Sequence, residues 1–242
     1  MADDRARPPA PPLSVVIPCL NEAERLPLLL ADLQRWPAAS ELLLVDGGST
    51  DRSAATAALA GARVLSSTPP CRGRQLATGA HRAQHPWLLF LHADSRLPPD
   101  WAECVSRAIS RAAHHADAEM GTAWFFRLRI APSTAARRLL ERVVQLRSQL
   151  GQTPYGDQGL LIHRRLYDAC GGFAPIPLME DLDLVLRIGR RAHLQSLPCP
   201  ISTDGRRWDR SGVLRRSWLN ARLRRRWRQG EPPERLAVLY AR

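Results

Sequence analysis

Lysine is absent from this 242-residue chain, so all 35 of its basic side chains are arginines. Only 23 acidic residues oppose them, which leaves a formal net charge of +12. A compositional bias with many solvated arginines is one explanation. The other is an anionic partner, such as a nucleotide diphosphate, a phosphorylated acceptor, nucleic acid or an acidic membrane, because a guanidinium fork binds two phosphate oxygens at once. Composition leaves both explanations open.

Long apolar runs and paired cysteines are also absent. No stretch of about 18 apolar residues is present to span a bilayer, and the opening MADDRARPPAPP lacks the apolar core of a signal peptide. The five cysteines are odd in number and form no C-x-x-C pair, which argues against a disulfide framework or a zinc knuckle. We therefore expect a reduced, cytoplasmic protein in which residues 1–12 are a disordered leader.

Apolar runs in the first half predict a regular α/β arrangement. Hydrophobic residues make up 45% of the chain, enough for the core of one domain with a helical annex. Helices are expected between strands, including one that Asn21 caps and that ends at Arg35, and one over residues 72–84. This alternation predicts a mostly parallel sheet covered by helices on both faces. The predicted buried strands lie at residues 13–18, 41–46, 62–67 and 87–94.

The second half is less regular in its pattern. Alternating and apolar segments predict further strands at residues 123–130, 156–163 and 193–198. Helices are predicted at residues 135–150 and 179–191. A basic, tryptophan-bearing helix is expected over residues 212–226.

Polar segments follow three of the predicted strands: PCLNE, DGGSTD and HADSR. Ligands of parallel α/β sheets bind beyond the carboxyl ends of the strands, so these segments are the first candidates for a site. Asp94 could bind a hard divalent cation that bridges two phosphates, or it could be a loop aspartate that bonds its own backbone. Asp46 emerges directly from a strand and is placed to accept hydrogen bonds from a base or a ribose.

Charged side chains at two predicted helix starts are further candidates. Glu180 and Asp181 could simply favour the positive end of the helix dipole, or one could be the general base that takes a proton from an acceptor hydroxyl. Arg72 and Arg74 either bind a diphosphate at a helix N-terminus or form a solvated turn. His92 is either structural, a metal ligand or a donor to phosphate.

In this order, SVVIPCLNEAERL, LLLVDGGSTD, FLHADSRLP and MEDLDLVLRI resemble the motifs of family 2 glycosyltransferases, which have the GT-A fold. LHAD, GDQG and PLMED resemble more closely a bacterial subgroup known as radical-SAM/selenodomain-associated glycosyltransferases. The similarity covers nearly the whole chain after residue 12. It implies a Rossmann-like, mostly parallel sheet with helices on both faces and a C-terminal helical extension.

The resemblance also implies a function: transfer of a sugar from a nucleotide donor, usually UDP-linked, with Mn²⁺ or Mg²⁺ and inversion by a single displacement. Asp94 would hold the metal and the diphosphate, and Asp181 would be the base, with Glu180 beside it. Residues on the acceptor or phosphate side would be His92, Asp157, Gln158, Arg207 and Trp208. The nucleotide-sugar-binding set would be Pro18, Asn21, Glu22, Asp46, Arg72, Arg74 and Asp94.

Three positions depart from the family pattern. His92 replaces the first carboxylate of the usual Asp-x-Asp, Gly47 stands where a second Asp is frequent, and Ala77 replaces a frequent Asn. We therefore expect Asp94 to be the main protein ligand of a metal that binds weakly without nucleotide. GRRW only partly matches the Gln-x-x-Arg-Trp signature of processive members, so polymer synthesis is not expected.

The predicted organisation is a GT-A domain over residues 13–203 and a basic helical extension over residues 204–242. Within the domain, residues 13–100 form the nucleotide-binding half and residues 101–203 the acceptor-side half. The acceptor is expected to be lipid-linked or phosphorylated. Through its basic tail the protein is expected to contact an anionic membrane, at the inner face.

Two other functions stay open from sequence. A sugar-phosphate nucleotidyltransferase shares this type of sheet but typically has a glycine-rich basic loop where this chain has PCLNEAER. The tail RRSWLNARLRRRWRQG suits a non-catalytic protein that binds anionic lipid or RNA. Binding alone leaves the acidic strand ends unexplained, and no specific nucleic acid is expected.

Overall fold

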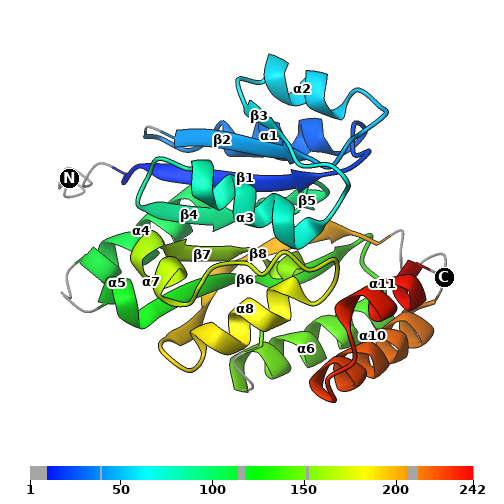
Figure 1. The fold of residues 1–242 in the computed structure, drawn as a ribbon. Helices are drawn as coiled ribbons and strands as arrows, with labels where there is room; N and C mark the ends of the chain where they lie inside the picture. The colour runs from blue at the N-terminus through cyan, green and yellow to red at the C-terminus, as the bar shows by residue number, and fades with distance from the viewer. Residues whose placement is uncertain (1–9, 39, 114–117, 151–152, 206–211, 242) are drawn as a thin grey trace.

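The computed structural model describes residues 10–38, 40–113, 118–150, 153–205 and 212–241. Its eight-stranded sheet has the order β3-β2-β1-β4-β7-β6-β8-β5. Figure 1 shows the strands as one twisted layer with helices in front of it and behind it. The expected α/β class, a mostly parallel sheet covered on both faces, is confirmed.

The first half of the chain forms the parallel part of the sheet. β1 (Leu13–Cys19) pairs in parallel with β2 (Ser40–Asp46) and β4 (Trp87–Phe90), and β2 pairs with β3 (Arg63–Ser66). The connections are α1 (Leu26–Leu33), α2 (Ser53–Leu59) and α3 (Arg72–Arg82). All four strands predicted in this half are present, although the fourth ends at Phe90.

The predicted start of the first helix is wrong. α1 begins at Leu26, and Arg25 is the residue that precedes it. Asn21 has a left-handed backbone with φ of 55°, a conformation that asparagine adopts more readily than most residues. Its side-chain Oδ1 accepts a hydrogen bond from the Thr50 N–H at 2.8 Å. It therefore joins two loops and does not cap a helix.

The second half adds strands of both directions. β7 (Leu160–His163) is antiparallel to β4 and to β6 (Thr122–Ala131), and β6 is parallel to β8 (His193–Asp204). The short β5 (Ser95–Arg96) pairs antiparallel with β8. The segment predicted as one strand at residues 156–163 divides into the turn η1 (Gly156–Gln158) and β7. β8 is six residues longer than the predicted 193–198, since it continues to Asp204.

Two hydrophobic clusters lie on opposite faces of the sheet. One contains Val15 and Ile17 and is covered by α1 and by α4 (Trp101–Ala113). The other contains Val16 and is covered by α3 and by α8 (Glu180–Ile188). Consecutive β1 residues thus face different clusters, as expected for a strand buried on both sides. The remaining helices of this half are α5 (Ala118–Gly121), α6 (Ala135–Leu150) and α7 (Arg164–Ala169).

The C-terminal segment forms two helices, α10 (Val213–Arg228) and α11 (Pro233–Ala241). The sequence pattern predicted the first and not the second. Leu223 and Leu236 are almost fully buried in a cluster with Met179 and Leu182. The two helices are thereby held against the start of α8, beyond the strand ends (Figure 1). The division of the chain into residues 13–203 and 204–242 stays a prediction.

None of the helices in the described ranges combines the length and the apolar character that a membrane crossing requires.

Candidate active site

A cavity of about 400 Å³ opens between the carboxyl ends of the central strands and the C-terminal helices. Four carboxylates line it, from the loop after β4, the turn η1, the start of α8 and the end of β8. Arginines from α3 and α10 line it as well. The charged lining residues are Asp94, Asp157, Asp181, Asp204, Arg72, Arg216 and Arg224.

Asp181 is held from three directions at the start of α8. Its Oδ2 accepts a hydrogen bond from the Gly156 N–H at 2.7 Å and a longer one from Arg72 Nη2 at 3.4 Å. Its Oδ1 accepts from the Leu182 N–H at 2.7 Å. Met179, two residues earlier, has a left-handed backbone with φ of 68°, which is uncommon for a side chain of this size. The chain therefore turns sharply just before the carboxylate that it presents to the cavity.

Glu180 lies beneath the cavity and does not line it. Its side chain is fully buried, and its Oε1 accepts a hydrogen bond from Arg72 Nε. Burial raises the pKa of Glu180, and the charge of Arg72 opposes the rise. Burial alone would lower the pKa of Arg72, but Glu180 and Asp181 outweigh this and raise it. The structure therefore makes Glu180 the anchor of Arg72, and Arg72 contacts Asp181.

Gly156 lies where several polar side chains converge. A Cβ at this position would lie 2.8 Å from His92 Nε2 and 3.2 Å from both Arg72 Nη2 and Asp181 Oδ2. Glycine thus lets the backbone N–H approach Asp181 while His92 and Arg72 pack beside it. The predicted residues His92, Arg72 and Asp181, which are far apart in sequence, are brought to one place.

Asp157 and Gln158, neighbours in η1, have different environments. Burial raises the pKa of Asp157 to about 6, with Asp181 and Asp94 acting in the same direction against Arg147 and Arg72. Its Oδ1 is buried and has no hydrogen-bond partner within the described part of the chain. Asp157 is therefore a cavity residue with an unsatisfied oxygen.

Gln158 does not reach the cavity. Its Oε1 accepts hydrogen bonds from Ser148 Oγ at 2.9 Å and from the Tyr155 N–H at 3.2 Å, and its Nε2 donates to the Phe126 carbonyl at 3.2 Å. The side chain is fully buried. Because the amide bonds only to the protein, the structure places Gln158 as a support of η1 and not on the acceptor side.

Asp94 has a neighbour that the sequence pattern did not indicate. Ser95 pairs with Thr203 and Arg96 with Ser202, so the same antiparallel register sets Asp94 opposite Asp204. Both aspartates line the cavity. Asp204 accepts a hydrogen bond from Arg25 Nε. Asp204 is an acid at the end of a strand, which is the signal that marked the other candidates. It was missed because that strand was predicted to end at residue 198.

The loops after β1 and β2 are joined to each other. The Asn21 N–H donates to Ser49 Oγ at 2.9 Å, and the Glu22 N–H donates to Ser53 Oγ at 2.9 Å. Asp46 accepts from the backbone N–H groups of Gly48 and Ser49. The polar side chains of both loops thus bind the protein itself.

The predicted nucleotide-sugar-binding set is therefore divided by the structure. Arg72 and Asp94 line the cavity, whereas Pro18 is buried in β1 and Arg74 is exposed on α3. The loop residues Asn21, Glu22 and Asp46 lie at the ends of β1 and β2 and are not among the cavity's lining residues. Arg207 and Trp208 lie outside the described residues.

The cavity fits a hard cation in part. In the described ranges, no group of three or more His, Cys, Asp or Glu side chains is arranged to hold a metal ion. Asp94 and Asp157 nevertheless line one cavity, and carboxylate oxygens are the donor type that Mg²⁺ and Mn²⁺ take. An ion held there would need further ligands, which donor phosphates and water can supply.

The arrangement of sheet and helices matches solved structures of the GT-A fold, two of which contain a nucleotide-sugar. A mannosyltransferase from Pyrobaculum calidifontis, in complex with GDP-Man and Mn²⁺, matches with a TM-score of 0.65 and 15% identity, over 96% of this chain and 68% of that one. TarS residues 1–349 from S. aureus, in complex with UDP-GlcNAc, match with a TM-score of 0.63 and 14% identity, over 79% of this chain and 58% of that one. At such identities the likeness shows the fold.

The chain belongs to glycosyl transferase family 2, whose family model matches residues 14–165. An uncharacterised glycosyltransferase of Mycobacterium tuberculosis is 39% identical to it over 85 residues. That match covers 35% of this chain and only 38% of the relative, so it extends to a minor part of either protein. The finer resemblance to the radical-SAM/selenodomain-associated subgroup stays a prediction.

Proposed function

We propose that this chain transfers a sugar from a nucleotide-sugar donor to an acceptor hydroxyl in a metal-dependent, inverting reaction. The observation that carries the proposal is the position of Asp181. Its carboxylate is oriented by Gly156, Leu182 and Arg72 and faces a cavity that Asp94 also lines. A base held rigidly beside a phosphate-binding carboxylate is the arrangement that glycosyl transfer to a hydroxyl requires.

In this reaction the acceptor oxygen forms a bond to the anomeric carbon of the donor. The bond from that carbon to the phosphate oxygen breaks, and its electron pair leaves with the nucleoside diphosphate. Asp181 takes the proton of the acceptor hydroxyl, and Arg72 keeps the carboxylate in place. A divalent cation at Asp94 would neutralise charge on the diphosphate leaving group. Inversion follows from a single displacement.

The donor's nucleoside is proposed to lie beyond the ends of β1 and β2, next to Glu22 and Asp46. The loops there are fixed to each other by hydrogen bonds, so their backbone groups are already ordered before a ligand binds. A UDP-linked donor is favoured by the family resemblance, and the GDP-Man complex of the Pyrobaculum protein makes GDP a nucleotide to include in any test.

Calorimetry with UDP, GDP and ADP, each with and without Mg²⁺ or Mn²⁺, tests the donor site. We expect one nucleotide to bind and the metal to strengthen its binding. Asp94→Ala should weaken the metal-dependent part at least tenfold, an estimate based on loss of about one charged ligand. Asp168→Ala, which removes an exposed carboxylate on α7, is the matched control. Unchanged metal-dependent binding in Asp94→Ala would remove Asp94 from the site.

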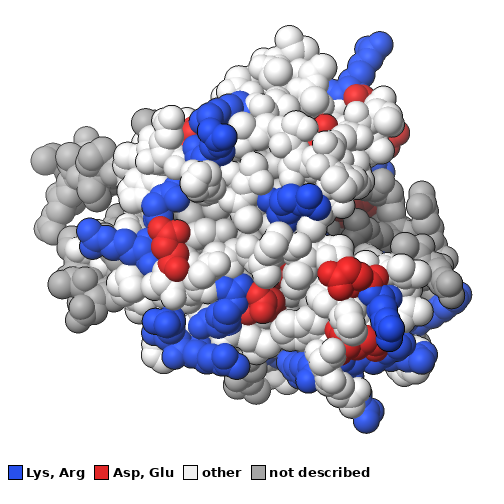
Figure 2. Space-filling view, viewed as in Figure 1, with Lys and Arg blue, Asp and Glu red and all other residues white. Residues whose placement is uncertain are grey.

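Membership of family 2 supports a glycosyltransferase over the two alternatives that the sequence left open, a nucleotidyltransferase and a non-catalytic binding protein. A cytoplasmic location, a lipid-linked or phosphorylated acceptor and contact with an anionic inner membrane stay proposals. Figure 2 supports the membrane contact, since basic side chains gather over α10 and α11, although acidic patches lie among them. Arg215 and Trp218 are exposed on α10, so sedimentation with phosphatidylglycerol vesicles should depend on them.

A further inference from the structure

α10 divides its side chains among three surroundings. Leu219, Leu223 and Trp227 lie in the hydrophobic cluster with α8. Arg216, Asn220 and Arg224 line the cavity, and their spacing of four residues places them along one face of the helix. Arg215, Trp218, Arg222 and Arg225 are exposed. Only the middle set, which we call the basic wall, faces the space where Asp181 lies.

The guanidinium groups of the basic wall rest on aromatic rings and not on carboxylates. Arg216 lies 4.2 Å from the centre of the Tyr240 ring, and Arg224 lies 5.0 Å from the centre of the Tyr155 ring. Neither pairs with an acid among the residues that the structure describes. Stacking on a ring orients a guanidinium but leaves its N–H groups for a ligand.

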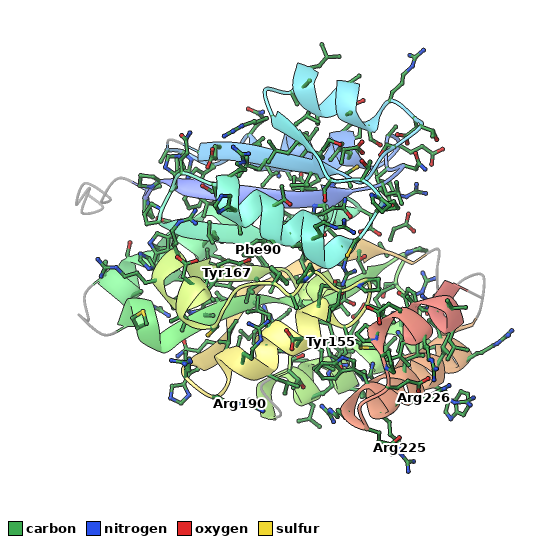
Figure 3. All side chains as sticks on the ribbon, in the orientation of Figure 1. Phe90, Tyr155, Tyr167, Arg190, Arg225 and Arg226 are labelled. Carbon is green, nitrogen blue, oxygen red and sulfur yellow. The ribbon has the colours of Figure 1, made fainter. Side chains whose placement is uncertain are left out.

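A third arginine reinforces this wall from behind. Arg147 of α6 lies 3.7 Å from the centre of the Tyr155 ring, which Figure 3 labels. Its Nε and Nη2 are buried and have no hydrogen-bond partner in the described ranges. Burial lowers the pKa of Arg147, and the charge of Arg224 acts in the same direction. Arg147 therefore adds a positive charge behind the Tyr155 ring, over which Arg224 also lies.

The basic wall is fixed relative to the proposed base. Leu182 follows Asp181 in sequence, Leu223 precedes Arg224, and these two leucines pack in the same cluster and are at most 1% exposed. A group bound to Arg224 is therefore held at a constant position relative to Asp181. The proposed donor diphosphate has its own charged residues, Arg72 and Asp94, which come from other elements.

From this arrangement we infer that the basic wall binds an oxyanion of the acceptor, a phosphate in the first instance, and thereby places the acceptor's hydroxyl against Asp181. The inference rests on the proposed function and adds to it the chemical class of the acceptor. A phosphate of a lipid headgroup and a phosphate of a soluble metabolite offer the same chemistry. Both are bound by bidentate contacts with arginine.

Calorimetric titration with inorganic phosphate and with glycerol 3-phosphate, in the presence of saturating nucleotide diphosphate and Mg²⁺, tests the inference. Replacing Arg216 and Arg224 together by Gln should weaken phosphate binding about tenfold or more, since two charged donors are lost. Replacing Arg222 and Arg225 by Gln removes the same charge from the exposed face of the same helix. Figure 3 shows Arg225 projecting away from the protein, and this control should change binding less than about twofold.

Several results would overturn the inference. Equal loss in the two double variants would mean that the net charge of α10 attracts phosphate without a defined site. Competition between phosphate and the nucleotide diphosphate would assign the basic wall to the donor. If the wild-type chain binds nucleotide but not phosphate, the basic wall is rejected and the proposed function stands. If the wild-type chain does not bind nucleotide, the proposed function itself is rejected.

Two additions keep the test decisive. Arg224→Lys keeps the charge and loses the planar fork, so it should weaken phosphate binding by a smaller factor than is expected of the double variant. This single substitution tests the basic wall if the double variant does not fold. Vesicles that contain phosphatidic acid, offered as competitors of glycerol 3-phosphate, distinguish the sources. Competition by the vesicles in the wild type supports a lipid phosphate, and binding of glycerol 3-phosphate without competition supports a soluble one.

Discussion

The polar loops at the ends of β1 and β2 and the polar lining of the cavity differ in how their hydrogen bonds are satisfied. In the loops, Asn21 and Asp46 bind backbone groups of the protein. Around the cavity, Asp157 Oδ1 and two nitrogens of Arg147 are buried and find no partner in the part of the chain that the structure describes. Both regions consist of residue types common at ligand sites.

The difference indicates two ways in which a polar residue serves a site. Residues in the loops give the backbone a fixed shape and offer a preformed surface to a nucleoside. Asp157, in the cavity, keeps an unsatisfied oxygen, at a cost to the stability of the fold that a ligand could offset. The unsatisfied oxygen of Asp157 therefore distinguishes the cavity from the loops, whose polar side chains are already bonded to the protein.

The largest expected effect is on catalysis at the cavity. Asp181→Asn keeps the size of the side chain but cannot accept the proton, so product formation from the cognate donor should fall by about 10²- to 10⁴-fold. Mass spectrometry of products formed in cell extract measures the rate, and calorimetry should find nucleotide binding within about twofold of the wild type. Asp183→Asn, whose carboxylate pairs with Arg187, is the control on the same helix. A variant Asp181→Asn as active as the control would reject the assigned base.

A large effect on stability is expected beneath the cavity. Arg72→Met leaves the fully buried Glu180 without its cation, and the free energy of unfolding should fall by about 2 to 3 kcal/mol. Guanidinium denaturation measures this change. Arg74→Met, two residues away and exposed, should change it by less than about 0.5 kcal/mol. Equal effects of the two substitutions would contradict the buried anchor.

The raised pKa of Asp157 predicts a pH dependence of stability. Between about pH 4 and pH 6 the folded chain keeps a proton that the unfolded chain has lost, so this residue makes the free energy of unfolding fall as pH rises. Asp157→Asn removes that contribution. Relative to the wild type, the variant should gain about 1 to 3 kcal/mol between pH 4 and pH 7, measured by denaturation with a chelator present. Parallel pH profiles of the two proteins would show that the unsatisfied carboxyl does not titrate in this way.

A smaller effect is expected in the loops. Asn21→Ala loses the hydrogen bond to Thr50 and must also adopt a left-handed backbone, so it should lower the free energy of unfolding by about 1 to 2 kcal/mol. Asn21→Gly loses the hydrogen bond but accepts the conformation, and it should cost about half as much. Thermal denaturation of the pair separates the two contributions. If glycine costs as much as alanine, the backbone conformation contributes nothing.

Part of this molecule could be predicted from sequence because its signals are local. Runs such as LSVVIP and WLLF are apolar and short, and their burial on both faces of the sheet follows from pattern alone. The carboxylates Asp94, Asp157 and Asp181 were predicted as site residues, and the structure brings all three to one cavity. The order of the motifs was sufficient to predict that these residues meet, because each motif lies where an element ends or begins at the same edge of the sheet.

The remaining residues depend on contacts between distant segments. Asp204 lies opposite Asp94 only because β5 pairs with β8. Gly47 lies against Gln75 and Pro70, each of which has an atom 3.1 Å from the position that a Cβ would take. That crowding is the structural reason for glycine at this position. Neither neighbour is close in sequence, so no local pattern reveals them.

By itself the sequence determined the class of sheet, the edge at which its acidic motifs meet and the basic character of its C-terminal segment. These features follow from hydrophobic periodicity, motif order and composition, which are properties of the sequence alone. Only the tertiary structure decided that Gln158 supports the site and does not reach it, that Glu180 anchors Arg72 beneath the cavity, and that α10 turns one of three faces toward Asp181. Those outcomes depend on which side chains are left with partners after packing, and packing joins residues that the sequence keeps apart.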